Sequence, residues 1–117
     1  MPPVHRIDVW ALRKLFNTEI LPRVEAGEVK EVILSENPAN PKFGQPAGTR
    51  SQMVAYLEAR DGRIRQLARA HRYLRPDGNL GGSGKRLPDP KEVLHEGKLH
   101  KPFLQKKARC TKGQNSV

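Results

Sequence analysis

The sequence is short of cysteine and of aromatic residues, and each shortage narrows what the protein can be. The single cysteine, Cys110, cannot form a disulfide within the chain. Aromatic residues make up 5% and hydrophobic residues 36% of the 117 residues, so only a modest core can be buried. We therefore expect one small domain, residues 1–103, followed by a segment that stays outside its core.

Long apolar runs are also missing. No stretch approaches the roughly 18 apolar residues of a membrane-spanning helix. The first ten residues, MPPVHRIDVW, lack the apolar stretch that is typical of a secretory signal. These observations predict a cytoplasmic protein without a membrane partner.

Acidic residues are too few to balance the basic ones. Lys and Arg number 22 against 12 Asp and Glu, which gives a formal net charge of +10. Such an excess raises association rates with anions and is typical of proteins that meet nucleic acid or an acidic protein surface. A charged surface that serves only solubility is the simplest alternative.

Metal and nucleotide cofactors are not predicted. His95 and His100 would diverge by roughly 140° on a helix, and no cysteine cluster accompanies them. The glycine-rich stretch at 79–86 (NLGGSGKR) differs from a P-loop at two places, because Asn79 replaces the first glycine and Arg86 follows Lys85 where Ser or Thr is needed. A structural turn, or a simple phosphate contact, fits this stretch better.

The hydrophobic pattern predicts an α+β fold. Asp8 is a suitable N-cap for a helix over 8–21, whose apolar stripe would form core or a dimer face. Residues 28–35 are typical of a strand, and 36–49 of a long loop. Asp89 and Pro90 predict a short helix over 90–95, and a strand should follow over 98–103. The stripe consists of Val9, Leu12, Phe16 and Ile20, with Trp10 beside it.

Residues 51–75 allow two interpretations. Asp61-Gly62 between two apolar-patterned runs is a strong hairpin signal, and it predicts a small antiparallel sheet. The composition also fits two helices, which would make the protein all-α. On the strand interpretation, one face of 63–75 carries Arg63, Arg65, Leu67, Arg69, His71, Tyr73 and Arg75.

One stretch resembles a known group of sequences. The elements YLRPDG (73–78), GGSG (81–84) and PDPK (88–91) resemble a segment of short, uncharacterised bacterial proteins. In such proteins the run before the turn is richer in β-branched residues, which supports the hairpin. The resemblance implies no activity.

The arginine-rich stretch is the strongest functional signal. Arg60 to Arg75 holds six arginines and one acidic residue, and such a surface binds phosphates without reading sequence. Tyr73 could stack on an unpaired base. The segment 104–117 is basic and polar, so we expect a flexible tail that extends this surface. The predicted nucleic-acid contacts are Arg63, Arg65, Arg69, Arg72, Tyr73, Arg75, Lys85, Arg86, Lys101, Lys106, Lys107 and Arg109.

Two other function classes remain open. A small toxin-like ribonuclease needs a base, an acid and a phosphate-binding cation, and His71, Tyr73, Arg75 and Lys85 could supply them if they lay together. A protein-interaction or inhibitory module would bind an acidic partner and no nucleic acid. Binding without catalysis is the expectation, with either RNA or DNA as the partner and a homodimer as an option.

Overall fold

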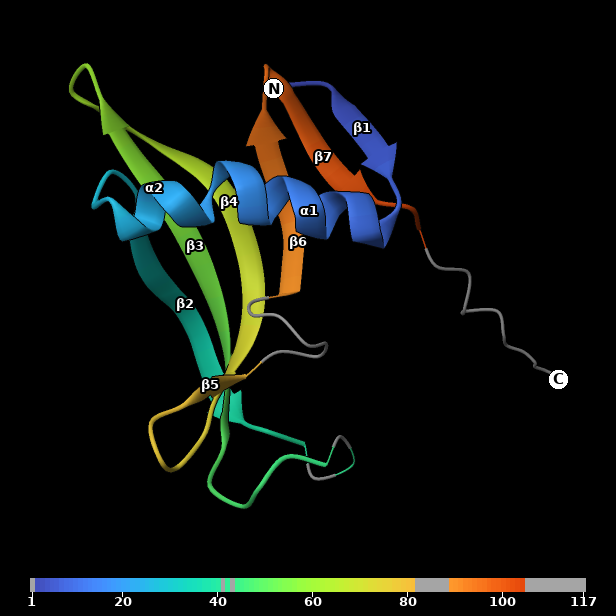
Figure 1. The fold of residues 1–117 in the computed structure, drawn as a ribbon, viewed down its shortest axis with the longest axis vertical. Helices are drawn as coiled ribbons and strands as arrows, with labels where there is room; N and C mark the ends of the chain where they lie inside the picture. The colour runs from blue at the N-terminus through green and yellow to red at the C-terminus, as the bar shows by residue number, and fades with distance from the viewer. Residues whose placement is uncertain (1, 41, 43, 82–88, 105–117) are drawn as a thin grey trace, which may run out of the picture.

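The computed structural model describes residues 2–40, 42, 44–81 and 89–104, and every structural statement below concerns these ranges. They form an α+β domain in which two helices cross one face of a mixed β-sheet (Figure 1). The elements are β1 (Val4–Ile7), α1 (Val9–Glu19), α2 (Leu21–Glu25), β2 (Lys30–Pro38), β3 (Arg50–Arg60), β4 (Arg63–Leu74), β5 (Leu80–Gly81), β6 (Asp89–His95) and β7 (Lys98–Pro102).

The strands form a single sheet in the order β1-β7-β6-β4-β3-β2, with β5 paired to the end of β4. Neighbouring strands are antiparallel, except that β1 runs parallel to β7. The predicted α+β class is therefore confirmed, whereas the sheet is mixed and larger than expected because β1 and β5 carry no strong strand signal of their own.

The N-terminal helix begins where the sequence predicts. The Asp8 carboxylate accepts a hydrogen bond from the Trp10 backbone N–H at 2.9 Å, which caps α1. Pro22 lies in the first turn of α2, so the chain bends after Ile20 and continues as a short second helix. Leu12, Phe16 and Ile20 are buried against the sheet and form core, whereas Val9 and Trp10 at the start of the predicted stripe are exposed.

The hairpin at 51–75 is confirmed, and the all-α alternative is wrong. Asp61 and Gly62 both have positive φ, +53° and +75°, as a two-residue type I′ turn requires. Such a turn matches the right-handed twist of the strands that it joins.

The helix predicted over 90–95 is wrong, since Asp89–His95 forms strand β6 between β4 and β7. The Asp-Pro cap signal is local, and it is outweighed by cross-strand pairing and by burial of Val93, which is 0% exposed. Glu96 and Gly97, both with positive φ, turn the chain directly into β7. Strand β2 also differs from its prediction, because it runs on to Pro38 and includes the start of the expected loop.

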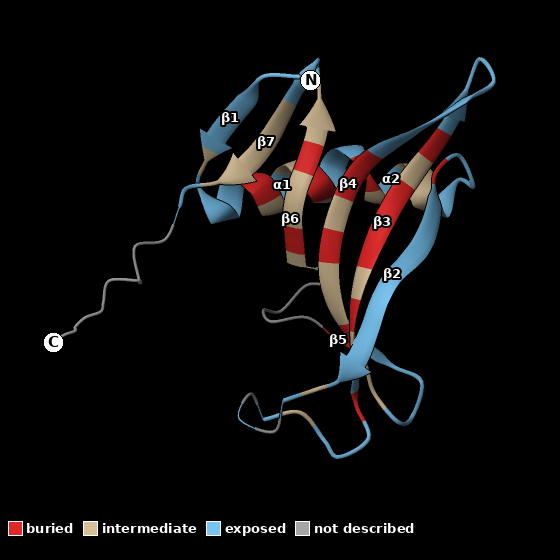
Figure 2. Cartoon of the chain, turned by 180° about the vertical axis from the view of Figure 1, so that it is seen from behind, coloured by how far each residue is buried: buried red, intermediate tan, exposed pale blue. Residues whose placement is uncertain are grey.

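The sheet has a front face, covered by α1 and α2, and a back face. Val54 and Tyr56 of β3, with Ala68 and Ala70 of β4, pack into one hydrophobic cluster with α1 on the front face. Figure 2 shows the sheet from behind, with both helices on the far side. Neither helix of the described chain covers this back face.

Two predictions fall outside the described ranges, namely the tail beyond Leu104 and most of the glycine-rich connector. None of the helices that the structure describes is long and apolar enough to cross a membrane.

Candidate nucleic-acid interface

A β-bulge in β4 divides the arginines between the two faces. Tyr56 pairs with Ala68 whereas Leu57 pairs with Gln66, so Leu67 has no partner in β3 and the alternation of side chains restarts there. As a result Arg65 lies on the front face and Arg69 on the back face. The single arginine face that strict alternation predicts is therefore not formed.

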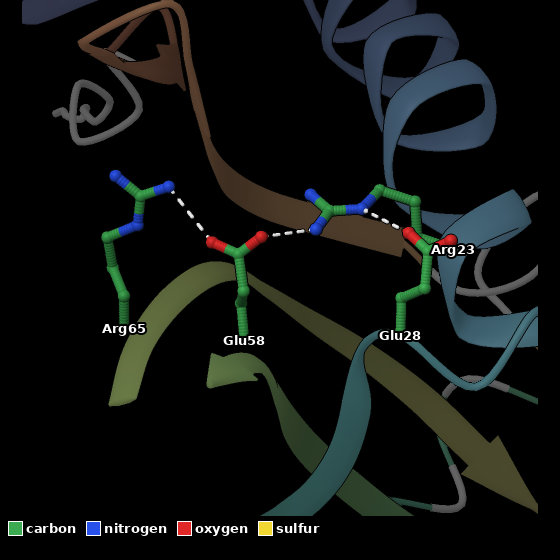
Figure 3. A network of polar contacts seen from close by, with 4 residues as sticks. All are labelled: Arg23, Glu28, Glu58 and Arg65. Atoms are coloured by element: carbon green, nitrogen blue, oxygen red, sulfur yellow. Dashed lines mark hydrogen bonds and ion pairs between the residues drawn. The ribbon is translucent and has the colours of Figure 1, made fainter. Parts of the chain in front are cut away.

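On the front face, Glu58 binds two arginines (Figure 3). Glu58 is 6% exposed, and its carboxylate contacts both Arg23 of α2 and Arg65 of β4, the latter at 3.0 Å. Arg23 also pairs with Glu28 at 3.2 Å. The hydrogen bond from Arg23, aided by the one from Arg65, lowers the pKa of Glu58 below its ordinary value. Glu58 thus ties the hairpin to α2 through Arg23, and it compensates the charge of Arg65.

A second front-face network holds Arg72. Its Nε donates to Gln52 Oε1 at 2.9 Å, and its Nη1 lies 3.4 Å from Glu31 Oε2. Gln52 donates in turn to Glu36, which also pairs with Arg50 at 3.5 Å. The Arg72 side chain is only 11% exposed, so it is part of the packed sheet.

The side chains of Arg75 and Tyr73 are also packed within the domain. Arg75 donates to Gln45 Oε1 at 3.2 Å, and its guanidinium fills the space beside Gly81, where a Cβ would clash with it. Tyr73 is 8% exposed. This burial is at odds with the predicted stacking of Tyr73 on a base, because little of its ring reaches solvent.

The back face gathers cations around fewer carboxylates. Glu92 of β6 lies 3.6 Å from Arg69 Nη2 and 3.8 Å from Lys101 Nζ. Asp89, at the start of β6, lies 3.1 Å from Arg13 Nη2 and 3.4 Å from Lys91 Nζ. We call Arg69, Lys91 and Lys101 with Asp89 and Glu92 the back-face cluster; Arg13, on α1 and only 14% exposed, lies outside it.

The two networks differ in their charge balance. On the front face, four arginines pair with four glutamates, so the network is neutral. In the back-face cluster, three cations share two carboxylates among the described residues, and one of these carboxylates, Asp89, also pairs with Arg13 of α1. The cluster therefore keeps an excess of positive charge that an anion could neutralise.

His71 lies beside this cluster. Its Nε2 is 2.6 Å from Ser51 Oγ, and its ring meets that of Tyr73 edge-on, with centroids 4.7 Å apart. In the sheet register His71 stands opposite Asp89. Burial lowers the pKa of His71, and the charge of Lys91 lowers it further against an opposing effect of Asp89. The imidazole is therefore neutral at neutral pH.

The hairpin tip forms a separate exposed basic segment. All residues from Ala59 to Gln66 are exposed. Within the described chain, no carboxylate lies within 4.0 Å of the cationic groups of Arg60 or Arg63. The tip thus offers two solvent-exposed guanidinium groups.

Five of the predicted contacts lie outside the described ranges: Lys85, Arg86, Lys106, Lys107 and Arg109. The described chain holds 16 of the 22 Lys and Arg residues and all 12 acidic residues, so six cations of the net charge of +10 belong to the remainder. Among the described residues, no group of three or more His, Cys, Asp or Glu could hold a metal ion.

The ribonuclease residues suggested by the sequence are not assembled as such. His71 and Tyr73 are in contact, whereas Arg75 is bound to Gln45, and Lys85 lies outside the described ranges. Instead, the fold brings Ser51 into contact with His71, and it brings Lys91 near enough for its charge to lower the pKa of His71. Neither could have been found from spacing, because Ser51 precedes His71 by 20 residues and Lys91 is the unpaired residue of a bulge in β6.

Comparisons of the chain with protein-family models, with curated proteins and with solved structures found no match.

Proposed function

We propose that the protein binds nucleic acid on the back face of its sheet, through phosphate contacts from the back-face cluster. The observation that carries this proposal is the charge balance, three cations to two carboxylates, of which Asp89 also pairs with Arg13 of α1. A phosphate backbone supplies the missing negative charge, and release of its counterions favours binding.

The position of the cluster on the sheet also supports binding at the back face. Arg69 lies on β4 and Lys101 on β7, so the cluster extends over the strands β4, β6 and β7 of a face that no described helix covers. An extended chain of phosphates needs such a broad, open surface. The hairpin tip, with Arg60 and Arg63, provides a second contact beyond the sheet.

The test is a fluorescence-anisotropy titration of labelled 16-nucleotide RNA and DNA strands over a series of salt concentrations. In the variant Arg69→Gln/Lys101→Gln, the slope of log K against log salt should become shallower by about 0.7 to 0.9 for each lost phosphate contact. The fold should persist, because both side chains are partly exposed and lie on the surface of the sheet.

A matched control removes the same charge elsewhere. Lys14 of α1 and Lys98 of β7 are exposed, and no described carboxylate lies within 4.0 Å of either amine. The variant Lys14→Gln/Lys98→Gln should keep the wild-type salt slope. Equal slopes for both double variants would remove the back face from the proposal, and an absence of binding to either strand would refute the function itself.

A further inference from the structure

We propose that the bound nucleic acid is RNA and that His71 cleaves it as a general base, in a site formed with Lys91 beside the back-face cluster. This inference rests on the proposed function and assigns it a substrate. It differs from simple binding because it requires a hydroxyl next to the scissile phosphate, which RNA has and DNA lacks.

The Ser51 contact shows that a hydroxyl reaches the imidazole. Ser51 Oγ lies 2.6 Å from His71 Nε2, a normal hydrogen-bond distance between side chains of adjacent strands. Both residues are partly exposed on the open back face. A ribose 2′-hydroxyl that enters from solvent can take the place of the serine hydroxyl at Nε2.

The surroundings of His71 favour its neutral form, which can accept a proton. Asp89 stands opposite His71 on β6, and Lys91 acts on it through its charge. Arg69 and Tyr73 are its neighbours on the same side of β4, and Ser51 and Met53 face it from β3. Burial, followed by the charge of Lys91, lowers its pKa below the ordinary value of 6.5, so the ring is unprotonated at pH 7 and able to accept a proton.

The chemistry is an internal transfer at phosphorus. His71 Nε2 takes the proton of the 2′-hydroxyl, the 2′-oxygen forms a bond to phosphorus, and the bond from phosphorus to the 5′-oxygen breaks. The departing 5′-oxygen takes a proton from water, and the resulting hydroxide removes the proton from His71. The products are a 2′,3′-cyclic phosphate and a free 5′-hydroxyl, and the Lys91 ammonium stabilises the negative charge that develops on the phosphate oxygens.

The experiment incubates the full-length protein with a 5′-labelled 16-nucleotide RNA, the matching DNA and the matching 2′-O-methyl RNA. Products are separated on a gel and identified by mass spectrometry. We expect cleavage of the RNA alone, with 2′,3′-cyclic phosphate ends. The variant His71→Ala should cleave about 10²- to 10⁴-fold more slowly while still binding RNA. His5→Ala, at an exposed histidine of β1, is the matched control and should cleave like wild type.

Two further variants separate catalysis from folding. Lys91→Gln should slow cleavage by roughly 10²-fold and should shift the acid limb of the pH–rate profile to higher pH, because it removes a charge that lowers the pKa of His71. Ser51→Ala should retain cleavage, because the serine only occupies the place of the substrate hydroxyl. A structural role of Lys91 would not move the pH profile.

The outcomes distinguish the cleavage inference from the proposed function. RNA that is bound but left intact would overturn the cleavage inference and leave the proposed function standing, whereas RNA that is not bound would refute both. Cleavage of DNA, equal cleavage by His71→Ala, or complete loss of cleavage in Ser51→Ala would contradict the mechanism, the last by making Ser51 the nucleophile.

Discussion

Both faces of the sheet carry charged residues, but the charges balance on the front face and leave an excess of positive charge on the back face. On the front face, four arginines pair with four glutamates, Glu58 being shared by Arg23 and Arg65, and the pairs connect strands to one another and to α2. On the back face, three cations share Asp89 and Glu92, and Asp89 also pairs with Arg13 of α1. The number of arginines in a segment therefore does not measure its capacity to bind an anion, because carboxylate partners elsewhere in the chain decide how much charge remains.

Deletion of Leu67 should cause the largest loss of stability on the front face. Without the bulge residue, Ala68 and Gln66 become neighbours in β4, and Arg65 stays opposite Glu58, so the front-face ion pairs persist. The deletion removes a leucine that is only 3% exposed, and we expect the free energy of unfolding to fall by about 3 to 5 kcal/mol. Urea denaturation measures this value, and a deletion variant as stable as wild type would show that Leu67 is dispensable.

Neutralisation of Glu58 should affect the front face alone. Glu58→Gln leaves Arg23 and Arg65 without their shared carboxylate, and we expect a loss of about 1 to 3 kcal/mol in thermal or urea denaturation. Glu28→Gln removes an exposed partner and should cost less than about 1 kcal/mol. RNA affinity of the folded Glu58→Gln protein should be unchanged, and a large drop in affinity would mean that the two faces are coupled.

The same carboxylate predicts a pH dependence of stability. Because Arg23 and Arg65 lower the pKa of Glu58, its stabilising effect is fully present above the ordinary value of 4.5 and is lost as the pH falls through the folded-state pKa. The free energy of unfolding of wild type and of Glu58→Gln should therefore converge in acid. A difference that stays constant down to low pH would exclude Glu58 as its source.

Neutralisation of Glu92 should increase the difference between the two faces, because it leaves cationic side chains of the back face without their carboxylate partner. In Glu92→Gln, Arg69 and Lys101 lose their shared carboxylate. We expect tighter RNA binding and a salt slope steeper by about 0.7 to 0.9. Glu96→Gln removes the same charge from the turn between β6 and β7, where the side chain is 83% exposed, and should leave the slope unchanged.

The smallest effect is expected at the hairpin tip. Arg60→Gln/Arg63→Gln removes two exposed guanidinium groups that lie beyond the sheet, so the salt slope should change less than in Arg69→Gln/Lys101→Gln. The same anisotropy titration measures both. A larger change for the tip variant would place the main contact on the hairpin.

The sequence predicts the fold where local chemistry decides it. Asp8 as a cap, the stripe from Leu12 to Ile20 and the Asp61-Gly62 turn all act within a few residues, and all three are confirmed. Strand β6 was predicted as a helix, because its strand state depends on pairing with β4 and β7.

The candidate site was harder to predict. The bulges at Leu67 and Lys91 arise from how strands pair, and the partners of the arginines come from distant segments: Arg72 finds Glu31 at a separation of 41 residues. A sequence pattern shows how side chains alternate within one strand. It does not show where a bulge interrupts the alternation or which carboxylates lie on the neighbouring strands.

The most direct test of the central claim follows the arginine side chains themselves. Titration of the isotope-labelled protein with non-cleavable 2′-O-methyl RNA would show in NMR spectra which arginine Nε–Hε groups respond. If the back face binds RNA, the Arg69 signal should shift while the signals of Arg65 and Arg72 stay in place. Shifts at Arg65 and Arg72 with an unperturbed Arg69 would contradict the assignment of nucleic-acid binding to the back face.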